Sequence, residues 1–255
     1  LRGFTHGIRE NVNTPCVSTG FTELDKLLDG GLYEGLYAIG AVSSMGKTTF
    51  TLQVADNIAK AGTDVLFFSL EMSANEIIAK SISRLTFELC KALNAYHEQS
   101  APRLFIIEGM GEVGVMQIRE TVQKHLMLTG RRPVVLIDYL QALAPYHDRG
   151  TDKQNTDKAV LELKRLSRDI KTPVIAISSF NRANYHGAAG LEAFKESGAI
   201  EYTADVVLAI QPEGVKHAGK DAEKKENKEA MHKYKSQEER RGEIVVLKQR
   251  NGATN

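Results

Sequence analysis

Gly46, Lys47 and Thr48 are the residues whose order most clearly suggests chemistry. They follow an apolar run that ends at Gly40 and a loop of small residues, and they open a segment with helical periodicity. Strand, loop and helix in this order are typical of a Walker A phosphate-binding loop, here with Ala41 where the usual pattern has its first glycine. In such a loop the backbone N–H groups and the helix dipole both favour phosphate oxygens. The loop expected to bind a nucleotide comprises Ser43, Ser44, Met45, Gly46, Lys47, Thr48 and Thr49.

Each residue type in this loop has an expected task. Gly46 lets the backbone approach the ligand closely. Lys47 is predicted to contact the β- and γ-phosphates, and the Thr48 hydroxyl is predicted to be a ligand of Mg²⁺. The loop alone therefore predicts nucleotide binding, whereas hydrolysis needs further groups.

Two acidic residues directly follow apolar runs that read as strands. Asp138 ends the run at 134–137, and Glu71 follows the run at 64–70. Ligands of open α/β folds bind at the carboxyl edge of the sheet, so Asp138 is expected to be a Walker B carboxylate that holds Mg²⁺ directly or through water. Glu71 would polarise the attacking water if its strand lies next to the strand of the phosphate loop. A capping contact beside Ser73 is an equal alternative for Glu71.

Arg250 follows the last run with strand character, at 243–247. A guanidinium in that place could stabilise the charge that develops on a transferred phosphoryl group, as an arginine finger does. Charged residues at turns more often simply face solvent, and position alone favours that interpretation.

The segments that must position these residues alternate between strand and helix patterns. Near-continuous apolar runs, typical of buried parallel strands, occur at 36–40, 64–70, 103–107, 133–138, 172–178, 204–210 and 243–247. Helical patterns cover 19–28, 46–62, 73–82, 117–128 and 156–170. A capping box of Ser73 and Glu76 marks the start of the third helix. The alternation predicts an α/β fold with a mostly parallel, twisted sheet and helices on both faces.

Composition limits the classes of partner. The formal net charge of +1 gives no global attraction to nucleic acid, so such binding would depend on local patches. The two cysteines stand far apart and the seven histidines show no ligand spacing, which argues against a thiolate metal site and fits a reducing compartment. No apolar run is long enough to span a bilayer. These features predict a cytoplasmic protein with no membrane partner.

The chain divides unevenly. Residues 1–17 are polar without a clear period and are expected to be an arm or linker, and residues 18–255 are expected to form one domain. Within that domain, residues 214–241 are dense in Lys and Glu and are predicted to be a flexible insertion. Solubility is the favoured explanation of their lysine content.

Seven segments, read together and in order, resemble the C-terminal motor domain of bacterial replicative DNA helicases of the DnaB type, within the RecA-like group. They are residues 18–25, 44–48, 68–73, 137–141, 178–182, 195–198 and 248–252. The sequences Ser-Leu-Glu-Met-Ser at 69–73 and Lys-Gln-Arg-Asn-Gly at 248–252 are far more specific than a phosphate-binding loop. The resemblance implies a RecA-like P-loop core that assembles into a ring, usually a hexamer. Such a ring hydrolyses ATP with Mg²⁺, translocates along single-stranded DNA, unwinds duplex DNA and meets primase and a helicase loader.

The resemblance also implies roles for single residues. Glu71 matches the catalytic glutamate and Asp138 the Walker B aspartate. Arg250, with Lys248, matches a basic pair offered to the γ-phosphate bound by the neighbouring subunit. The region between 182 and 198 matches a DNA-facing loop, with sequence-independent contacts expected from Arg182, Lys195, Glu196 and Gly198.

Ser179 departs from this family pattern. It stands where the family typically has a glutamine that senses the γ-phosphate and relays its presence to DNA. A hydroxyl is shorter, so the resemblance implies a weaker coupling at Ser179, or one routed through Asn181 or Arg182.

Two other functions stay open at this point. One is a RecA-like, nucleotide-gated assembly or recombination-accessory ATPase that unwinds nothing, which Ser179 motivates. The other is a P-loop enzyme acting on a small molecule, which would need an inserted substrate pocket. The only sizeable insertion, 214–241, holds no aromatic or histidine cluster to shape such a pocket.

Overall fold

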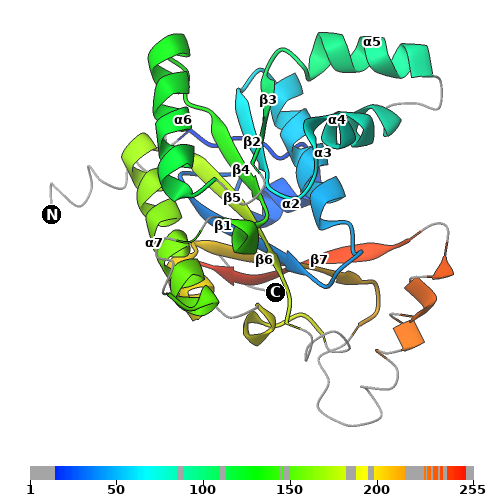
Figure 1. The fold of residues 1–255 in the computed structure, drawn as a ribbon. Coiled ribbons are helices and arrows are strands. Elements are labelled where there is room, and N and C mark those ends of the chain that lie inside the picture. The colour runs from blue at the N-terminus through cyan, green and yellow to red at the C-terminus, as the bar shows by residue number, and fades with distance from the viewer. Residues whose placement is uncertain are drawn as a thin grey trace, which may run out of the picture.

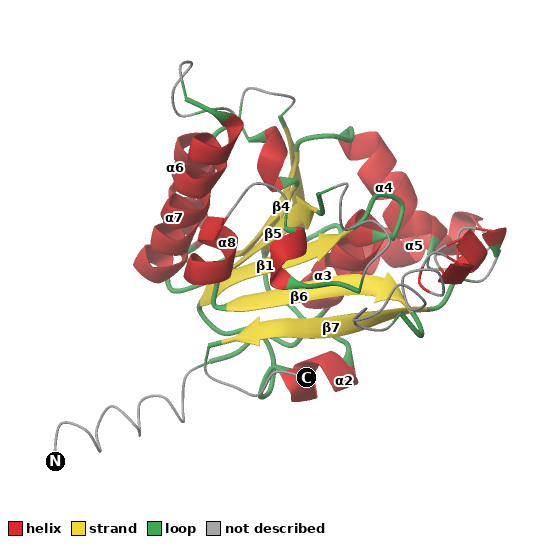
Figure 2. Ribbon diagram, turned by 90° about the horizontal axis from the view of Figure 1, so that it is seen from below, coloured by secondary structure: helices red, strands yellow, loops and turns green. Residues whose placement is uncertain are grey.

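A seven-stranded sheet forms the middle of three layers in the computed structural model of the protein (Figures 1 and 2). The structure describes residues 15–84, 89–109, 113–143, 145, 150–181, 188–194, 198–215, 227, 229–230, 232–234, 236–237 and 240–250. The strands are β1 (Gly35–Ala41), β2 (Val65–Ser69), β3 (Leu104–Glu108), β4 (Val134–Asp138), β5 (Pro173–Ser179), β6 (Val206–Pro212) and β7 (Gly242–Gln249). Their order is β3-β2-β4-β5-β1-β6-β7, and only β7 runs antiparallel to its neighbour. The predicted α/β fold with a mostly parallel sheet is confirmed.

Helices cover both faces of this sheet. They are α2 (Thr22–Leu27), α3 (Lys47–Lys60), α4 (Ala74–Ser83), α5 (Leu89–Gln99), α6 (Val115–Thr129), α7 (Asp152–Ile170) and α8 (Gly198–Thr203). One 3₁₀ turn, η1 (Leu140–Ala142), follows β4, and a second, η3 (Leu191–Ala193), precedes α8. Figures 1 and 2 place α6 and α7 on one face and α3, α4 and α5 on the other.

Two helices had no counterpart in the sequence prediction. Among the residues of α5 whose side chains are described, only Ala92 and Tyr96 are buried, so its apolar stripe is weak. The six residues of α8 are too few to show a helical period.

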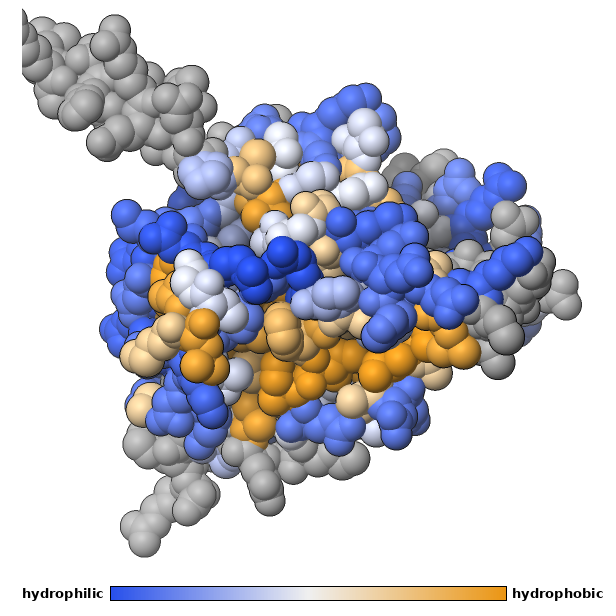
Figure 3. Space-filling model, turned by 90° about the horizontal axis from the view of Figure 1, so that it is seen from above, coloured by the Kyte–Doolittle hydropathy of each residue, from blue (hydrophilic) through white to orange (hydrophobic). Residues whose placement is uncertain are grey.

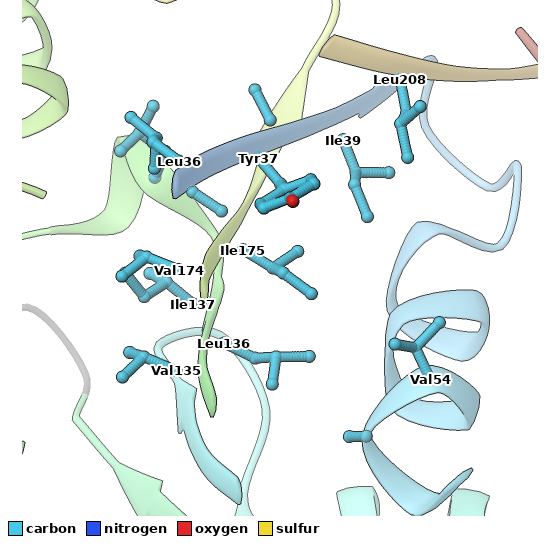
Figure 4. Packing of buried hydrophobic residues seen from close by; sticks show 14 of the residues in the cluster. Leu36, Tyr37, Ile39, Val54, Val135, Leu136, Ile137, Val174, Ile175 and Leu208 are labelled. Carbon is cyan, nitrogen blue, oxygen red and sulfur yellow. The ribbon is translucent and has the colours of Figure 1, made fainter. Parts of the chain in front are cut away.

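The core explains why the strand sequences are apolar at nearly every position. Successive side chains of a strand point to opposite faces, and both faces are covered here. Figure 4 shows Val135 and Ile137 on one side of β4 and Leu136 on the other, toward Val54 of α3. Leu136 and Ile137 are both completely buried.

Local signals place the start of α4 where the sequence predicts it. The Ser73 hydroxyl accepts a hydrogen bond from the Glu76 N–H, and the Glu76 carboxylate accepts one from the Ser73 N–H at 2.9 Å. This reciprocal pair satisfies two N–H groups at the helix start. The predicted capping box is therefore confirmed.

The chain segments at the predicted boundaries make contacts with the domain. Val17 pairs with Leu32 in an antiparallel bridge, and Tyr234 packs against the core with 8% of its surface exposed. Residues 1–14 and most of 214–241 lie outside the described residues, so the arm and the flexible insertion stay predictions.

Apolar residues also reach the surface, where Figure 3 shows them as a band bordered by hydrophilic residues. The large exposed apolar side chains of the described residues are Leu93, Phe105, Met116, Met127, Leu128, Leu161 and Tyr202. Within the part of the chain that the structure describes, none of the helices is both long enough and apolar enough to cross a membrane.

Candidate nucleotide-binding site

The carboxyl ends of four parallel strands bring the predicted site residues to one edge of the sheet. Ala41 at the end of β1 lies opposite Ser179 at the end of β5, and Ser69 of β2 lies opposite Asp138 of β4. The Leu70 N–H donates to the Asp138 carbonyl at 2.7 Å, which holds the segment after β2 against β4. This is the edge at which open α/β folds bind ligands.

The phosphate loop has the left-handed backbone that its glycine allows. Gly46 has φ +85° and is the N-cap of α3, and Ser44 also has a positive φ of 66°. A Cβ added at Gly46 would meet no atom of the chain within 4 Å, so this glycine is required for its backbone angle rather than for space within the chain. The first intrahelical hydrogen bond runs from the Phe50 N–H to the Gly46 carbonyl. The N–H groups of the first turn therefore point out of the helix end, toward the loop.

Lys47 lies between the loop and the acidic residues. Its ammonium group donates to the carbonyls of Ala41 and Val42, both at 3.1 Å. Burial lowers the pKa of Lys47, and the charges of Asp138 and Glu71 act in the opposite direction. The ammonium is thus in electrostatic range of both carboxylates.

Asp138 is buried beside Thr48, with 4% of its surface exposed. Burial raises the pKa of Asp138; a hydrogen bond from the Thr48 hydroxyl lowers it, and the charge of Glu71 raises it further. A carboxylate in this setting is stabilised by a nearby cation. Asp138 and Thr48 together present the hard oxygen donors that suit Mg²⁺, which takes its other ligands from phosphates and water.

Glu71 lies at the same sheet edge as the phosphate loop, but its strand is not next to the strand of that loop. The condition set for its role, that its strand lies next to the phosphate-loop strand, is not met, because β4 and β5 lie between β2 and β1. Glu71 nevertheless influences Lys47 and Asp138, since all of these strands end at the same edge. The alternative role as a helix cap is filled by Ser73, Glu76 and Glu108, whose carboxylate accepts a hydrogen bond from the Ala74 N–H.

Ser179 is linked to η1, the turn after β4, by a residue that the sequence did not single out. The Gln141 side-chain amide donates to the Ser178 hydroxyl at 2.9 Å, and its oxygen accepts from the Ser179 N–H at 3.5 Å. Only the adjacency of β4 and β5 reveals this contact. Asn181, suggested as an alternative relay, instead donates from its side chain to the Glu192 carbonyl at 3.1 Å.

The predicted DNA-facing residues are only partly described. Arg182, Lys195 and Glu196 lie outside the described residues, and Gly198 is the first residue of α8. The ends of the segment between β5 and α8 are tied together by an antiparallel bridge between Phe180 and Phe194, whose rings meet edge to face at 5.2 Å.

Lys248 and Arg250 lie at the opposite edge of the sheet from the phosphate loop. Because β7 is antiparallel, its end at Gln249 is paired with Val206 at the start of β6. The seven residues of β1 separate the two edges by about 20 Å. Lys248 donates to the carbonyls of Glu201 and Ala204 at 2.5 and 2.7 Å, and Arg250 donates to the Tyr202 carbonyl at 3.1 Å. Within one chain the basic pair therefore does not join Lys47, Glu71 and Asp138.

Known proteins that are similar to this chain in sequence and architecture include replicative helicases. The family profile of the DnaB-like helicase C-terminal domain matches residues 16–255. The replicative DNA helicase DnaB of Geobacillus stearothermophilus is 30% identical over 257 residues, an alignment that includes 92% of this chain and 52% of that protein. The chain thus spans about half the length of this curated relative.

Solved structures share the fold. The structure of the ATPase domain of the protein G40P superposes with a TM-score of 0.80 at 24% identity, covering all of this chain and 92% of that one. A DnaB-like replicative helicase, solved in a study of its interactions with primase, gives the same TM-score and identity, with 63% of its chain covered. These likenesses confirm the RecA-like architecture.

Proposed function

Because this chain belongs to the DnaB-like helicase C-terminal domain family, we propose that it is the motor of a ring-shaped helicase. It hydrolyses ATP with Mg²⁺ at the interfaces between subunits, and in the cytoplasm it uses this energy to move along single-stranded DNA and unwind duplex DNA. The assembly is a homo-oligomer, most simply a hexamer, with primase and a helicase loader as further partners.

The placement of the charged groups carries this proposal. Lys47, Glu71 and Asp138 gather at one edge of the sheet, while the basic pair is about 20 Å away at the other edge. A site that needs all of them is completed only when the edge of one subunit faces the opposite edge of the next.

Each residue has a task in hydrolysis. Lys47 and the N–H groups of the loop bind the phosphates, and Ser43, Ser44, Met45, Gly46 and Thr49 shape that loop. Thr48 and Asp138 would hold Mg²⁺, and the ion would supply positive charge next to the phosphate oxygens. Glu71 orients the attacking water and accepts its proton. Arg250, with Lys248, stabilises the charge that develops on the γ-phosphoryl group bound by the adjacent subunit.

Replacing Arg250 by alanine tests this arrangement. DNA-stimulated hydrolysis is expected to fall by about 10³-fold or more, the effect typical of a lost arginine finger, while binding of a fluorescent ATP analogue changes little. Arg165→Ala is the matched control, because Arg165 is also exposed (61%) and its ion pair among the described residues is with Glu162 on its own helix. Unchanged hydrolysis in Arg250→Ala would refute the role in the neighbouring site.

Ser179 favours a second candidate, an accessory ATPase that does not unwind DNA. A glutamine at 179 would be expected to relay the presence of the γ-phosphate to DNA. Here the Gln141 amide contacts Ser178 and Ser179 instead, so any such relay involves different side chains. A forked-duplex assay with the full-length protein separates the two functions. ATP-dependent strand separation supports the helicase, and its absence despite DNA-stimulated hydrolysis supports the accessory ATPase.

A further inference from the structure

Asp205 connects three parts of the fold at the edge that carries the basic pair. Its Oδ2 atom accepts a hydrogen bond from the Leu36 N–H of β1 at 2.8 Å and another from Lys164 Nζ of α7 at 2.6 Å. Its Oδ1 atom lies 3.4 Å from Arg250 Nη1, and its backbone carbonyl accepts the Arg250 N–H at 2.9 Å. The fit is close, because a Cβ at Gly35 would lie 2.9 Å from Oδ2. Asp205 therefore fixes both the backbone and the side chain of Arg250.

The charges around Asp205 need its carboxylate. Three cations, Lys164, Lys248 and Arg250, gather here. Burial lowers the pKa of Lys248, the charges of Arg250 and Lys164 lower it too, and Asp205 opposes them. Without the carboxylate the cations would repel one another. Arg250 would be displaced most easily, because its side chain is 49% exposed, against 18% for that of Lys164.

The remaining contacts leave Arg250 able to act on a ligand. Its Nη1 faces Asp205 and its Nη2 donates to the Tyr202 carbonyl at the end of α8. A guanidinium has five N–H donors, so these two contacts orient the group without using all of its donors. The carbonyls of Glu201 and Ala204 hold Lys248 on the same end of α8. Carbonyl groups at the end of α8 thus hold both Lys248 and Arg250.

We propose that Asp205 is a positioning residue that aims Arg250 at the nucleotide of the neighbouring subunit, an inference that rests on the function proposed above. Asp205 itself touches no reacting atom. Its effect is to hold the guanidinium in one place, so its loss lowers the rate of hydrolysis rather than the affinity for ATP.

The variant Asp205→Asn tests this role, because it keeps an acceptor for the Leu36 N–H and removes the charge. DNA-stimulated kcat is expected to fall by about tenfold to a hundredfold, the cost of a misplaced catalytic group, while the KM for ATP stays within about twofold. Asp169→Asn is the matched control, since it removes an aspartate that is 56% exposed and pairs with Arg119. An unchanged kcat in Asp205→Asn would overturn the inference.

Mixed rings separate a positioning role from simple damage to the fold. Subunits with Lys47→Ala have a defective phosphate loop but an intact Asp205 and Arg250. Mixed with Asp205→Asn subunits, they should form active interfaces, so the mixture hydrolyses ATP faster than either variant alone. A mixture that stays inactive would overturn the inference, because an Asp205→Asn subunit with a damaged fold cannot be rescued by its neighbour.

The corresponding mixture of Lys47→Ala with Arg250→Ala tests the underlying function separately. If that mixture regains activity and the Asp205→Asn mixture does not, the positioning role alone is refuted. If neither regains activity, the assignment of Arg250 to the neighbouring site fails, and the role of Asp205 fails with it.

Discussion

The buried carboxylate of Asp64 lies directly before β2, at the edge of the sheet opposite the nucleotide site. None of its side chain is exposed, and it contacts Arg103 Nη1 at 2.7 Å, Arg131 Nε at 2.9 Å and His125 Nε2 at 3.0 Å. Arg103 precedes β3, His125 lies on α6 and Arg131 precedes β4. The carboxylate therefore joins three elements, and we expect Asp64→Asn to destabilise the fold without altering the nucleotide site.

The magnitude follows from what the substitution leaves behind. Asparagine keeps one acceptor oxygen but carries no charge, so two guanidinium groups lose their counterion. Breaking a buried ion pair by removing one partner costs about 3–5 kcal/mol. Because both arginines retain some access to solvent, with side chains 32% and 53% exposed, the lower end, about 3 kcal/mol, applies. For a domain of this size that corresponds to a fall in Tm of roughly 6–12 °C.

The loss should depend on pH in a defined direction. Burial raises the pKa of Asp64, but hydrogen bonds from Arg131, Arg103 and His125 outweigh it and hold that pKa below its usual value. A carboxyl whose pKa is lower in the folded state stabilises the fold above the unfolded pKa of about 3.9, and that stabilisation is lost as the pH falls toward the folded value. The difference in the free energy of unfolding between wild type and Asp64→Asn should thus be constant near pH 7 and become smaller below about pH 4.

Urea unfolding followed by far-UV circular dichroism, repeated between pH 7 and pH 3, measures this. Asp169→Asn is the control, because its pair with Arg119 is equally short (2.6 Å) but its carboxylate is 56% exposed, and such pairs contribute about 0–1 kcal/mol. Two results would refute this prediction: an equally small loss of unfolding free energy in both variants at pH 7, or a loss in Asp64→Asn that is the same at pH 3 as at pH 7.

Two further predictions concern the nucleotide-binding edge. Because burial raises the pKa of Asp138, its negative charge opposes folding at neutral pH. Asp138→Asn should therefore raise the free energy of unfolding by about 1 kcal/mol, measured by thermal unfolding without nucleotide. The same substitution should abolish Mg²⁺-dependent hydrolysis. A loss of stability would contradict this sign. Gly40→Ala places a Cβ 2.4 Å from Phe180 and 2.6 Å from Phe194, and such overpacking should cost about 1–3 kcal/mol in urea unfolding. Gly198→Ala, whose Cβ would have its nearest atom at 3.8 Å, is the control and should cost nothing; equal losses in both variants would argue against the clash.

Features that depend on a few neighbouring residues were predictable from the sequence. The capping box of Ser73 and Glu76 and the buried strand character of residues 134–137 both arise from local hydrogen bonds or local periodicity. Asp138 was predicted at a strand end for the same reason. The family resemblance added Glu71 and Arg250, whose roles local patterns left open.

Contacts between distant segments were not predictable in this way. Nothing in the apolar run before Glu71 shows that β4 and β5 separate its strand from β1, and nothing in the run before Arg250 shows that β7 is antiparallel. The contact of Gln141 with Ser178 depends on η1 lying beside β5, and the packing of Phe180 and Phe194 next to Gly40 depends on the fold of the chain after β5. Strand order is set by how the whole sheet packs, and a run of apolar residues is compatible with many orders.

The sequence by itself therefore determined the local chemistry: a phosphate loop, a carboxylate at a strand end and a basic pair at the end of the last strand. Only the tertiary structure decided where these groups stand relative to one another. Lys47 and Asp138 share one edge, while Arg250 is held at the other by Asp205, which also bonds to Leu36, 169 positions away in the chain. The physical reason is that parallel strands bring their carboxyl ends together whatever their separation in sequence, and one antiparallel strand returns its end to the opposite edge.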